Sequence, residues 1–195
     1  MQRLAKDTGF TLIEVVVAAV IIGILAAIAA PSWLSILTHQ RLYNARANAL
    51  AKIREAQSQA IRTARSWEVC FRDRNGFVEV SVQPASSERG RNINNCRNHT
   101  AWQPLMNSAA DARLVAIKTN ETPGPRTSLD GNRTNGYSIR FGSRGERMGG
   151  TGAVSSWIVF TPRDNPQGPY YCVYAESIIG QFREGKIPAG QTACR

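Results

Sequence analysis

A single carboxylate lies inside an otherwise apolar run near the start of the chain. Residues 10–30 carry only one charged side chain, that of Glu14, and Gly9 immediately precedes the run. A carboxylate inside a membrane span costs roughly 2.5–3.5 kcal/mol at the centre on insertion scales. Glu14 therefore needs a partner or a functional reason to lie there. An opposite charge ~4 Å away would attract it by about 4 kcal/mol at an effective dielectric of ~20. Arg3 and Lys6 in the short leader predict that the leader stays cytoplasmic.

Two simpler interpretations of the apolar run remain open. Ala27-Ile28-Ala29 offers a small-residue cleavage site of the secretory kind. The apolar region of a secretory signal, however, spans about 7–15 residues, and this run is longer. A plain single-pass anchor fits the length, because about 20 apolar residues cross a bilayer core. That interpretation leaves Glu14 without a reason to be in lipid.

Residues 9–14, GFTLIE, resemble the processing site of type IV pilins and type II secretion pseudopilins. The resemblance implies that a prepilin peptidase cuts after Gly9 and methylates the new amine of Phe10. It also implies that Glu14 meets the terminal amine of a neighbouring subunit as a filament grows. The implied partners are other pilins or pseudopilins, the peptidase and the inner-membrane assembly platform, with no cofactor.

Helical periodicity continues beyond the apolar run. Pro31 is expected to kink the helix, because the period resumes after it, and a helix that stops there is the alternative. From 33 to 65, apolar and small residues recur every three or four positions and predict one buried face, consisting of Leu42, Ala45, Ala49, Ile53, Ala56, Ala60 and Ala64. So many alanines favour close packing on a sheet over a coiled coil or a helix lying on the membrane surface.

Beyond residue 66 the apolar pattern alternates with period two, which predicts strands. A hairpin is expected over 67–82, with Asp73-Arg74-Asn75-Gly76 at its turn. Later strands are predicted over 114–117, 137–141, 156–161, 171–175 and 177–183, and together they favour an antiparallel sheet. Polar stretches at 84–112 and 119–136 are predicted to be long surface loops.

These elements predict an α+β fold, with a long N-terminal helix on an antiparallel β-sheet, and the resemblance implies that this fold is of the type IV pilin kind. The expected divisions are a leader at 1–9, a transmembrane and filament-core helix at 10–30, an amphipathic half-helix at 31–65 and a β-rich periplasmic domain at 66–195. Residues 49–71 also resemble the helix-to-strand segment of the FimT/GspH subgroup. The resemblance implies a minor pilin or pseudopilin of an initiation or tip complex, single-pass in the bacterial inner membrane.

The four cysteines all follow the apolar run: Cys70, Cys96, Cys172 and Cys194. An oxidising compartment permits two disulfides, for which three connectivities are possible. We expect pairing of nearest neighbours, Cys70 with Cys96 and Cys172 with Cys194, since each link closes a loop that lacks regular structure. A metal site is not expected, because no C-x-x-C pair occurs and neither His39 nor His99 falls beside a cysteine cluster.

The chain is strongly basic, with 24 Lys and Arg against 14 Asp and Glu and a net charge of +10. Arginine-rich surfaces favour phosphate, which makes DNA a candidate ligand, although scattered charge that only solubilises the domain is the alternative. Gly180-Gln181-Phe182-Arg183, followed by Lys186, resembles a Gly-Arg-x-Arg loop of FimT-type minor pilins, with Gln181 in place of the first arginine. The resemblance implies DNA binding by Gly180 and Arg183, and the positive charge of Lys186 makes it a further candidate. An ordinary hairpin turn is the alternative.

Catalytic functions have little support in the sequence. Two histidines give a histidine-based triad little to build on, and no phosphate-cradling G-x-x-x-x-G-K-[ST] motif occurs. The stretch at 142–145, GSRG, lacks the glycine spacing of a nucleophile elbow. The sequence therefore predicts a structural assembly subunit without enzymatic activity, with DNA uptake as the alternative role. The basic charge favours a pilus over a secretion system.

Overall fold

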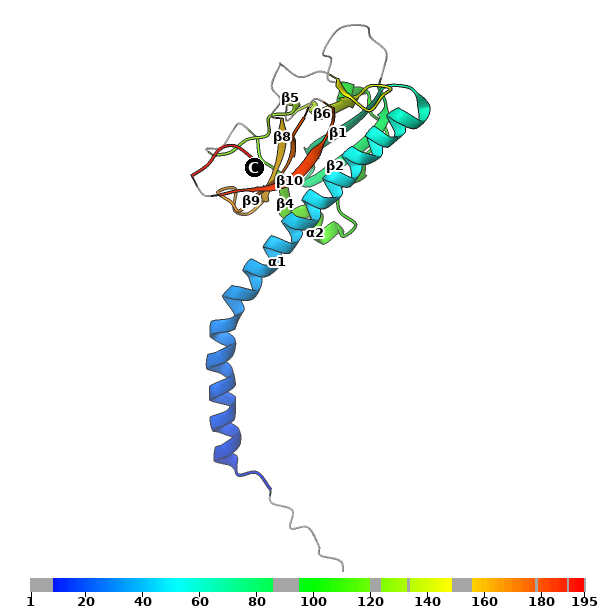
Figure 1. The fold of residues 1–195 in the computed structure, drawn as a ribbon. Coiled ribbons are helices and arrows are strands. Elements are labelled where there is room, and N and C mark those ends of the chain that lie inside the picture. The colour runs from blue at the N-terminus through cyan, green and yellow to red at the C-terminus, as the bar shows by residue number, and fades with distance from the viewer. Residues whose placement is uncertain are drawn as a thin grey trace, which may run out of the picture. The chain divides into compact units, whose positions relative to one another are not determined.

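The computed structural model describes residues 9–85, 95–119, 124–132, 134–148, 156–177, 179–188 and 190–194, without the side chains of 29–32. The chain divides into two compact units, Met1–Thr38 and His39–Arg195. One helix, α1, spans Leu12–Thr63 and so contributes to both units (Figure 1). Most of the expected leader lies outside the described residues.

The first unit is the apolar part of α1. Its described side chains from 9 to 28 are exposed, and α1 is long and apolar enough to cross a membrane by length and composition. The helix is unbroken at position 31, so the alternative that it stops at Pro31 is wrong. The kink at Pro31 stays a prediction.

The rest of α1 buries the predicted face in the second unit. Leu42, Ala45, Ala49, Ile53, Ala56 and Ala60 all lie in the main hydrophobic core. Ala64 does not, because the helix ends at Thr63 and the φ angle of Ala64 is 50°. The Ala64 N–H bonds to the Ile61 carbonyl at 3.4 Å and the Arg65 N–H to the Ala60 carbonyl at 3.3 Å, a Schellman termination. Including Ala64 in the buried face was therefore wrong.

Two antiparallel sheets follow α1, which confirms the α+β class and corrects the expectation of one sheet. In the first sheet the strand order is β3-β2-β1-β6-β5, with β7 paired to β6, and in the second it is β10-β9-β8-β4. The strands are β1 (Trp67–Arg74), β2 (Phe77–Pro84), β3 (Gln103–Pro104), β4 (Val115–Ile117), β5 (Asp130–Asn132), β6 (Gly136–Phe141), β7 (Arg147–Met148), β8 (Trp157–Pro162), β9 (Tyr170–Ala175) and β10 (Phe182–Ile187).

The predicted hairpin is confirmed, with Asn75 and Gly76 at positive φ between β1 and β2. The strand expected over 177–183 is wrong, because a turn places Gly180 at a φ of 88° and β10 begins only at Phe182. Within the polar stretch at 84–112, a 3-10 helix η1 (Asn95–Asn98), β3 and most of the short helix α2 (Ala109–Leu114) form, so the stretch is not one plain loop.

Period-two alternation gives each sheet an inner and an outer face. Inner side chains such as Phe71, Phe141 and Phe160 join the alanine face of α1 in one core. Burying a side chain of this size contributes roughly 1.5–3 kcal/mol. On the outer faces, Glu68 and Cys70 of β1 are buried in one place and Cys172 of β9 in another. Both disulfides start from these outer faces.

Candidate functional site

The motif at the N-terminus stands at the first turn of α1. The Glu14 N–H lies 3.1 Å from the Thr11 carbonyl oxygen and 3.4 Å from Thr11 Oγ1, so Thr11 occupies the N-cap position. Thr11 and Glu14 have the T-x-x-E spacing of a capping box. A carboxylate at this position is also favoured by the helix dipole. Glu14 therefore has a local structural role as a capping residue. A test of an intermolecular charge pair must distinguish that pairing from the capping role.

Gly9 has no structural reason to be glycine in the described part of the chain. A Cβ added there meets no described atom within 4 Å, and its φ lies outside the left-handed region. Phe10 next to it is 81 % exposed. A requirement for glycine at this position must therefore come from outside the fold.

The residues expected to bind DNA do not form one surface. Arg183 and Lys186 are three positions apart on β10, so their side chains leave opposite faces of the strand. Arg183 pairs with Glu176 at 2.6 Å, and Lys186 lies 5.6 Å from the Tyr171 ring centroid. Gly180 has a packing reason to be glycine, because a Cβ there would come within 2.8 Å of the Gly145 carbonyl oxygen.

A cleft of about 390 Å³ does bring one of these residues near another arginine. It is lined by Arg54 of α1 and by the segment from Ile179 to Arg183, with Glu176 at its wall. The Arg183 side chain is 65 % exposed. The cleft therefore presents two guanidinium groups, one of which is already neutralised by a carboxylate.

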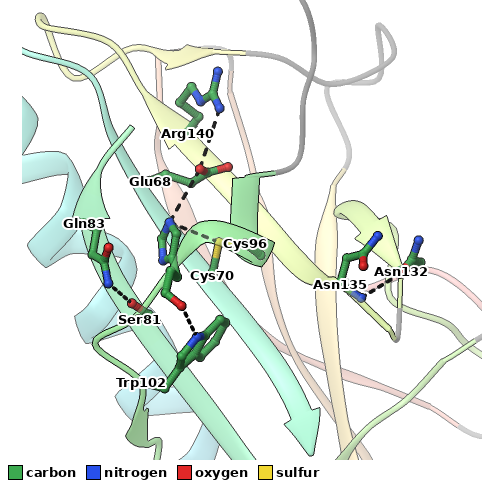
Figure 2. Close-up of a disulfide and its surroundings, with 10 residues drawn as sticks. Glu68, Cys70, Ser81, Gln83, Cys96, Trp102, Asn132, Asn135 and Arg140 are labelled. Carbon is green, nitrogen blue, oxygen red and sulfur yellow. Dashed lines mark hydrogen bonds and ion pairs between the residues drawn. A yellow bond between two sulfur atoms is a disulfide. The ribbon is translucent and has the colours of Figure 1, made fainter. Parts of the chain in front are cut away.

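Both disulfides have the pairing expected from the sequence. Cys70 is bonded to Cys96 and Cys172 to Cys194, with Cα–Cα distances of 5.6 and 6.2 Å. The second disulfide lies in an apolar cluster with Val159, Tyr170 and Ile187. The first lies among buried polar groups, which Figure 2 shows between β1, β6 and η1.

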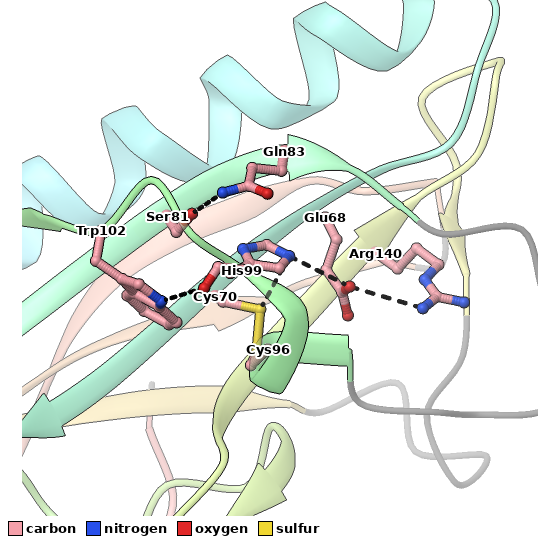
Figure 3. Close-up of polar contacts among 8 residues, drawn as sticks. All are labelled: Glu68, Cys70, Ser81, Gln83, Cys96, His99, Trp102 and Arg140. Atoms are coloured by element: carbon pink, nitrogen blue, oxygen red, sulfur yellow. Dashed lines mark hydrogen bonds and ion pairs between the residues drawn. A yellow bond between two sulfur atoms is a disulfide. The ribbon is translucent and has the colours of Figure 1, made fainter.

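We call Glu68, Cys70, Cys96, His99 and Arg140 the β1–η1 cluster. His99 Nε2 lies 3.6 Å from Cys70 Sγ and 3.7 Å from Glu68 Oε2, and Arg140 Nη2 lies 3.6 Å from the same Glu68 oxygen (Figure 3). Glu68 is only 1 % exposed. Sequence reasoning missed this cluster. It placed His99 beside no cysteine cluster, whereas His99 Nε2 lies 3.6 Å from the sulfur of the Cys70–Cys96 disulfide.

Local structure explains why these five residues meet. Glu68 and Cys70 are two positions apart on β1, so they share its outer face, and Glu68 is opposite Arg140 in the β1–β6 register. His99 follows η1, three residues after Cys96. The spacings E-x-C and C-x-x-H were therefore the signals available in the sequence, but only the disulfide and the strand register bring them together.

Neighbouring contacts fix the cluster in place. The Trp102 Nε1–H donates to the His99 carbonyl oxygen at 2.8 Å, and the guanidinium of Arg72 lies 3.8 Å from the Trp102 ring centroid. Gly136, at a φ of 93°, allows the close approach of η1, because a Cβ there would lie 3.2 Å from Cys96 Cβ. The segment that carries His99 is thus held from two sides.

A second group of buried titratable side chains lies near the other disulfide. Burial lowers the pKa of Lys118 and raises the pKa of Tyr170. Lys118 Nζ and Tyr170 Oη both donate to the Pro166 carbonyl oxygen, at 2.7 and 3.0 Å. This pair is hydrogen-bonded to backbone, which fits a structural role.

Comparison with known proteins bears on the N-terminus only. The family described as the prokaryotic N-terminal methylation motif matches residues 4–30. No curated protein and no solved structure matches the chain. The motif supports a type IV pilin-like protein and fits a pilin or a pseudopilin. A motif of this kind implies in general that the chain interacts with other pilins and with a prepilin peptidase. With the long apolar helix, it also fits a membrane-anchored protein.

Proposed function

We propose that the chain is a minor pilin or pseudopilin of the FimT/GspH type, a structural subunit rather than an enzyme. Its N-terminal helix assembles into a type IV pilus or a type II secretion pseudopilus, in an initiation or tip complex. The globular domain lies in the periplasm before assembly. The observation that carries the proposal is the methylation motif at the start of a long, exposed, apolar helix.

Two features of the first unit support assembly through α1. The described side chains from 10 to 28 are exposed and almost all apolar, so lipid or other helices must cover them. Gly9 is unconstrained by the fold, as expected of a residue selected by a processing enzyme. Cleavage after Gly9 would free the amine of Phe10, four residues before Glu14.

The processing step is tested with a glycine that has a matched control in the same unit. Gly9→Ala should leave the precursor uncut, because the peptidase must accommodate this residue at the scissile bond. Gly23→Ala is the control, since a Cβ at Gly23 also meets no described atom within 4 Å. Intact mass of the chain recovered from membranes gives the result. Normal processing of Gly9→Ala would contradict the proposal.

The assembly step requires a variant that separates the charge of Glu14 from its capping role. Glu14→Gln keeps a capping-box side chain but removes the negative charge. We expect it to be processed and membrane-inserted yet lost from sheared filaments, because no carboxylate meets the amine of the next subunit. Thr11→Ala, which weakens the cap by about 1 kcal/mol and keeps the charge, should still assemble. Wild-type amounts of Glu14→Gln in filaments would reject the charge pair.

DNA binding during uptake is a second candidate, favoured by the cleft that Arg54 and Arg183 share. A gel-shift titration of the purified chain at low salt tests it, because phosphate contacts are strongest there. Arg54→Gln and Arg183→Gln should each weaken binding, whereas Glu176→Gln should strengthen it by freeing Arg183. Lys186→Gln, on the other face of β10, is the control. Equal binding by all four variants, or none by the wild type, would remove this candidate.

A further inference from the structure

The β1–η1 cluster contains four side chains that could bind a metal ion, and two of them are joined in a disulfide. Ligand atoms of Glu68, Cys70 and His99 lie within 4.8 Å of one another, and all three residues are buried. Cys96 holds the fourth potential ligand atom, because its sulfur is bonded to that of Cys70. Figure 3 shows His99 between the disulfide and Glu68.

We propose that the chain with reduced Cys70 and Cys96 binds one thiophilic divalent cation of the zinc class. Its ligands are the two thiolates, His99 Nε2 and Glu68 Oε2. Formation of the disulfide removes both thiolates and releases the cation.

Two of the ligand distances already match a tetrahedral zinc site. Zinc bonds sulfur at about 2.3 Å and nitrogen or oxygen at about 2.0–2.2 Å, which places neighbouring ligand atoms roughly 3.3–3.8 Å apart at tetrahedral angles. Cys70 Sγ lies 3.6 Å from His99 Nε2, and that nitrogen lies 3.7 Å from Glu68 Oε2. Cys70 Sγ and the Glu68 carboxylate lie within 4.8 Å of each other, and the two bonded sulfurs must separate. Rotation about the Cα–Cβ bonds of the cysteines allows this.

An unpartnered carboxylate oxygen points to the same ligand. In the described part of the chain, Glu68 Oε2 is buried without a hydrogen-bond partner. A buried carboxylate oxygen in this state costs free energy unless something binds it. A cation with two thiolates and one carboxylate leaves one negative charge. The guanidinium of Arg140, 3.6 Å from Glu68 Oε2, balances that charge.

The second disulfide offers an internal control. In the described part of the chain, the group of potential metal ligands that lie within 4.8 Å of one another includes neither Cys172 nor Cys194, which pack with Val159, Tyr170 and Ile187. Reduction of that pair therefore yields two thiols without an imidazole or carboxylate from such a group. Two thiolates alone make an incomplete zinc site.

The chemistry balances with ordinary thiol reagents. A dithiol or phosphine reductant supplies two electrons to the Cys70–Cys96 disulfide, and the two resulting thiols lose two protons as the cation binds. A disulfide-bearing oxidant reverses this by taking two electrons from the thiolates, and the cation leaves unchanged as a divalent ion.

Zinc and cobalt titrations of the full-length chain in detergent test the proposal. The reduced chain, prepared under a phosphine, should bind one equivalent of Zn²⁺, and the oxidised chain should bind none. Co²⁺ in the reduced chain should give thiolate-to-metal charge-transfer bands and the intense visible bands of tetrahedral cobalt. Cys172→Ser with Cys194→Ser should retain all of this.

Ligand variants assign the site. His99→Gln and Glu68→Gln should each weaken Zn²⁺ binding tenfold or more, at least the loss expected for a supporting residue. His39→Gln is the control, because His39 hydrogen-bonds Tyr171 and lies in another part of the unit. Binding that is equal in reduced and oxidised chains, that survives Cys70→Ser with Cys96→Ser, or that lacks thiolate bands would overturn the proposal. Failure of the reduced wild type to bind Zn²⁺ would overturn it as well.

Discussion

The two disulfides constrain the chain alike but lie in different chemical surroundings. Their cysteines are separated by 26 and 22 residues, so loop closure alone predicts nearly equal stabilisation, about 3.5 kcal/mol each. Cys70 lies 3.6 Å from an imidazole nitrogen, whereas Cys172 lies among apolar side chains. The comparison separates what a disulfide does as a covalent link from what its sulfurs can do when reduced.

Each disulfide also attaches a short segment to the outer face of a sheet, and the two disulfides do so on different sheets. Cys70 is on the outer face of β1, where it holds η1, and Cys172 is on the outer face of β9, where it holds the C-terminal segment near Cys194. Within the residues that the structure describes, neither held segment contains a long helix or strand. A short segment without a ladder of its own gains most from a covalent attachment, because few other contacts offset its conformational entropy.

The largest predicted effect comes from removing each disulfide as a pair. Cys70→Ala with Cys96→Ala, and Cys172→Ala with Cys194→Ala, should each lower the free energy of unfolding by about 3.5 kcal/mol, since the loops are of similar length. Urea unfolding of the full-length chain in detergent, followed by tryptophan fluorescence, gives the values.

Serine replacements sharpen the comparison. At the first pair they should recover about 1 kcal/mol relative to alanine, because a hydroxyl at position 70 can hydrogen-bond His99. At the second pair they should recover nothing, since the hydroxyls would be buried among apolar groups. An equal response at the two pairs would mean that the surroundings do not matter.

A smaller effect is expected at the glycine that lets η1 approach β1. Gly136→Ala should cost about 3 kcal/mol, because it combines a positive φ with a Cβ only 3.0 Å from the Phe71 carbonyl oxygen and 3.2 Å from Cys96 Cβ. Gly76→Ala is the control, with a φ of 79° and open space, and should cost about 1 kcal/mol. The difference between the two variants in urea midpoint measures the cost of the close contact made by the added Cβ at position 136. Equal losses of stability would show that η1 moves away from the added Cβ at little cost.

The sequence predicted elements wherever local pattern decides structure. Alternation and the Asn75-Gly76 turn identify the first hairpin, and the alanine spacing identifies the buried face of α1. The strand expected over 177–183 does not form, because only one residue would separate it from the strand that ends at Ala175. One residue is too short a connection between two antiparallel strands. The chain uses a turn from Ser177 to Gly180 instead, and the Glu176 N–H bonds to the Gln181 carbonyl oxygen.

The two candidate sites differ in the same way. The N-terminal motif could be recognised from residues 9–14 because its geometry is local to the chain. The β1–η1 cluster depends on the register that sets Glu68 opposite Arg140 and on a link between β1 and η1. The link was expected from the order of the cysteines, but the register does not follow from composition or spacing, so the contacts of His99 with Cys70 and Glu68 were missed.

An effect smaller than that of Gly136→Ala is expected for the carboxylate beside the first disulfide. In the oxidised chain Glu68→Gln should lower the free energy of unfolding by about 2 kcal/mol, because Arg140 and His99 lose a buried negative partner. Glu184→Gln is the matched control, since Glu184 forms a 2.9 Å ion pair with Arg46 at a 27 % exposed side chain and should cost less than about 1 kcal/mol. If Glu68→Gln instead stabilises the oxidised chain, the carboxylate destabilises the protein while the disulfide is present, as expected of a ligand that is satisfied only in the reduced state.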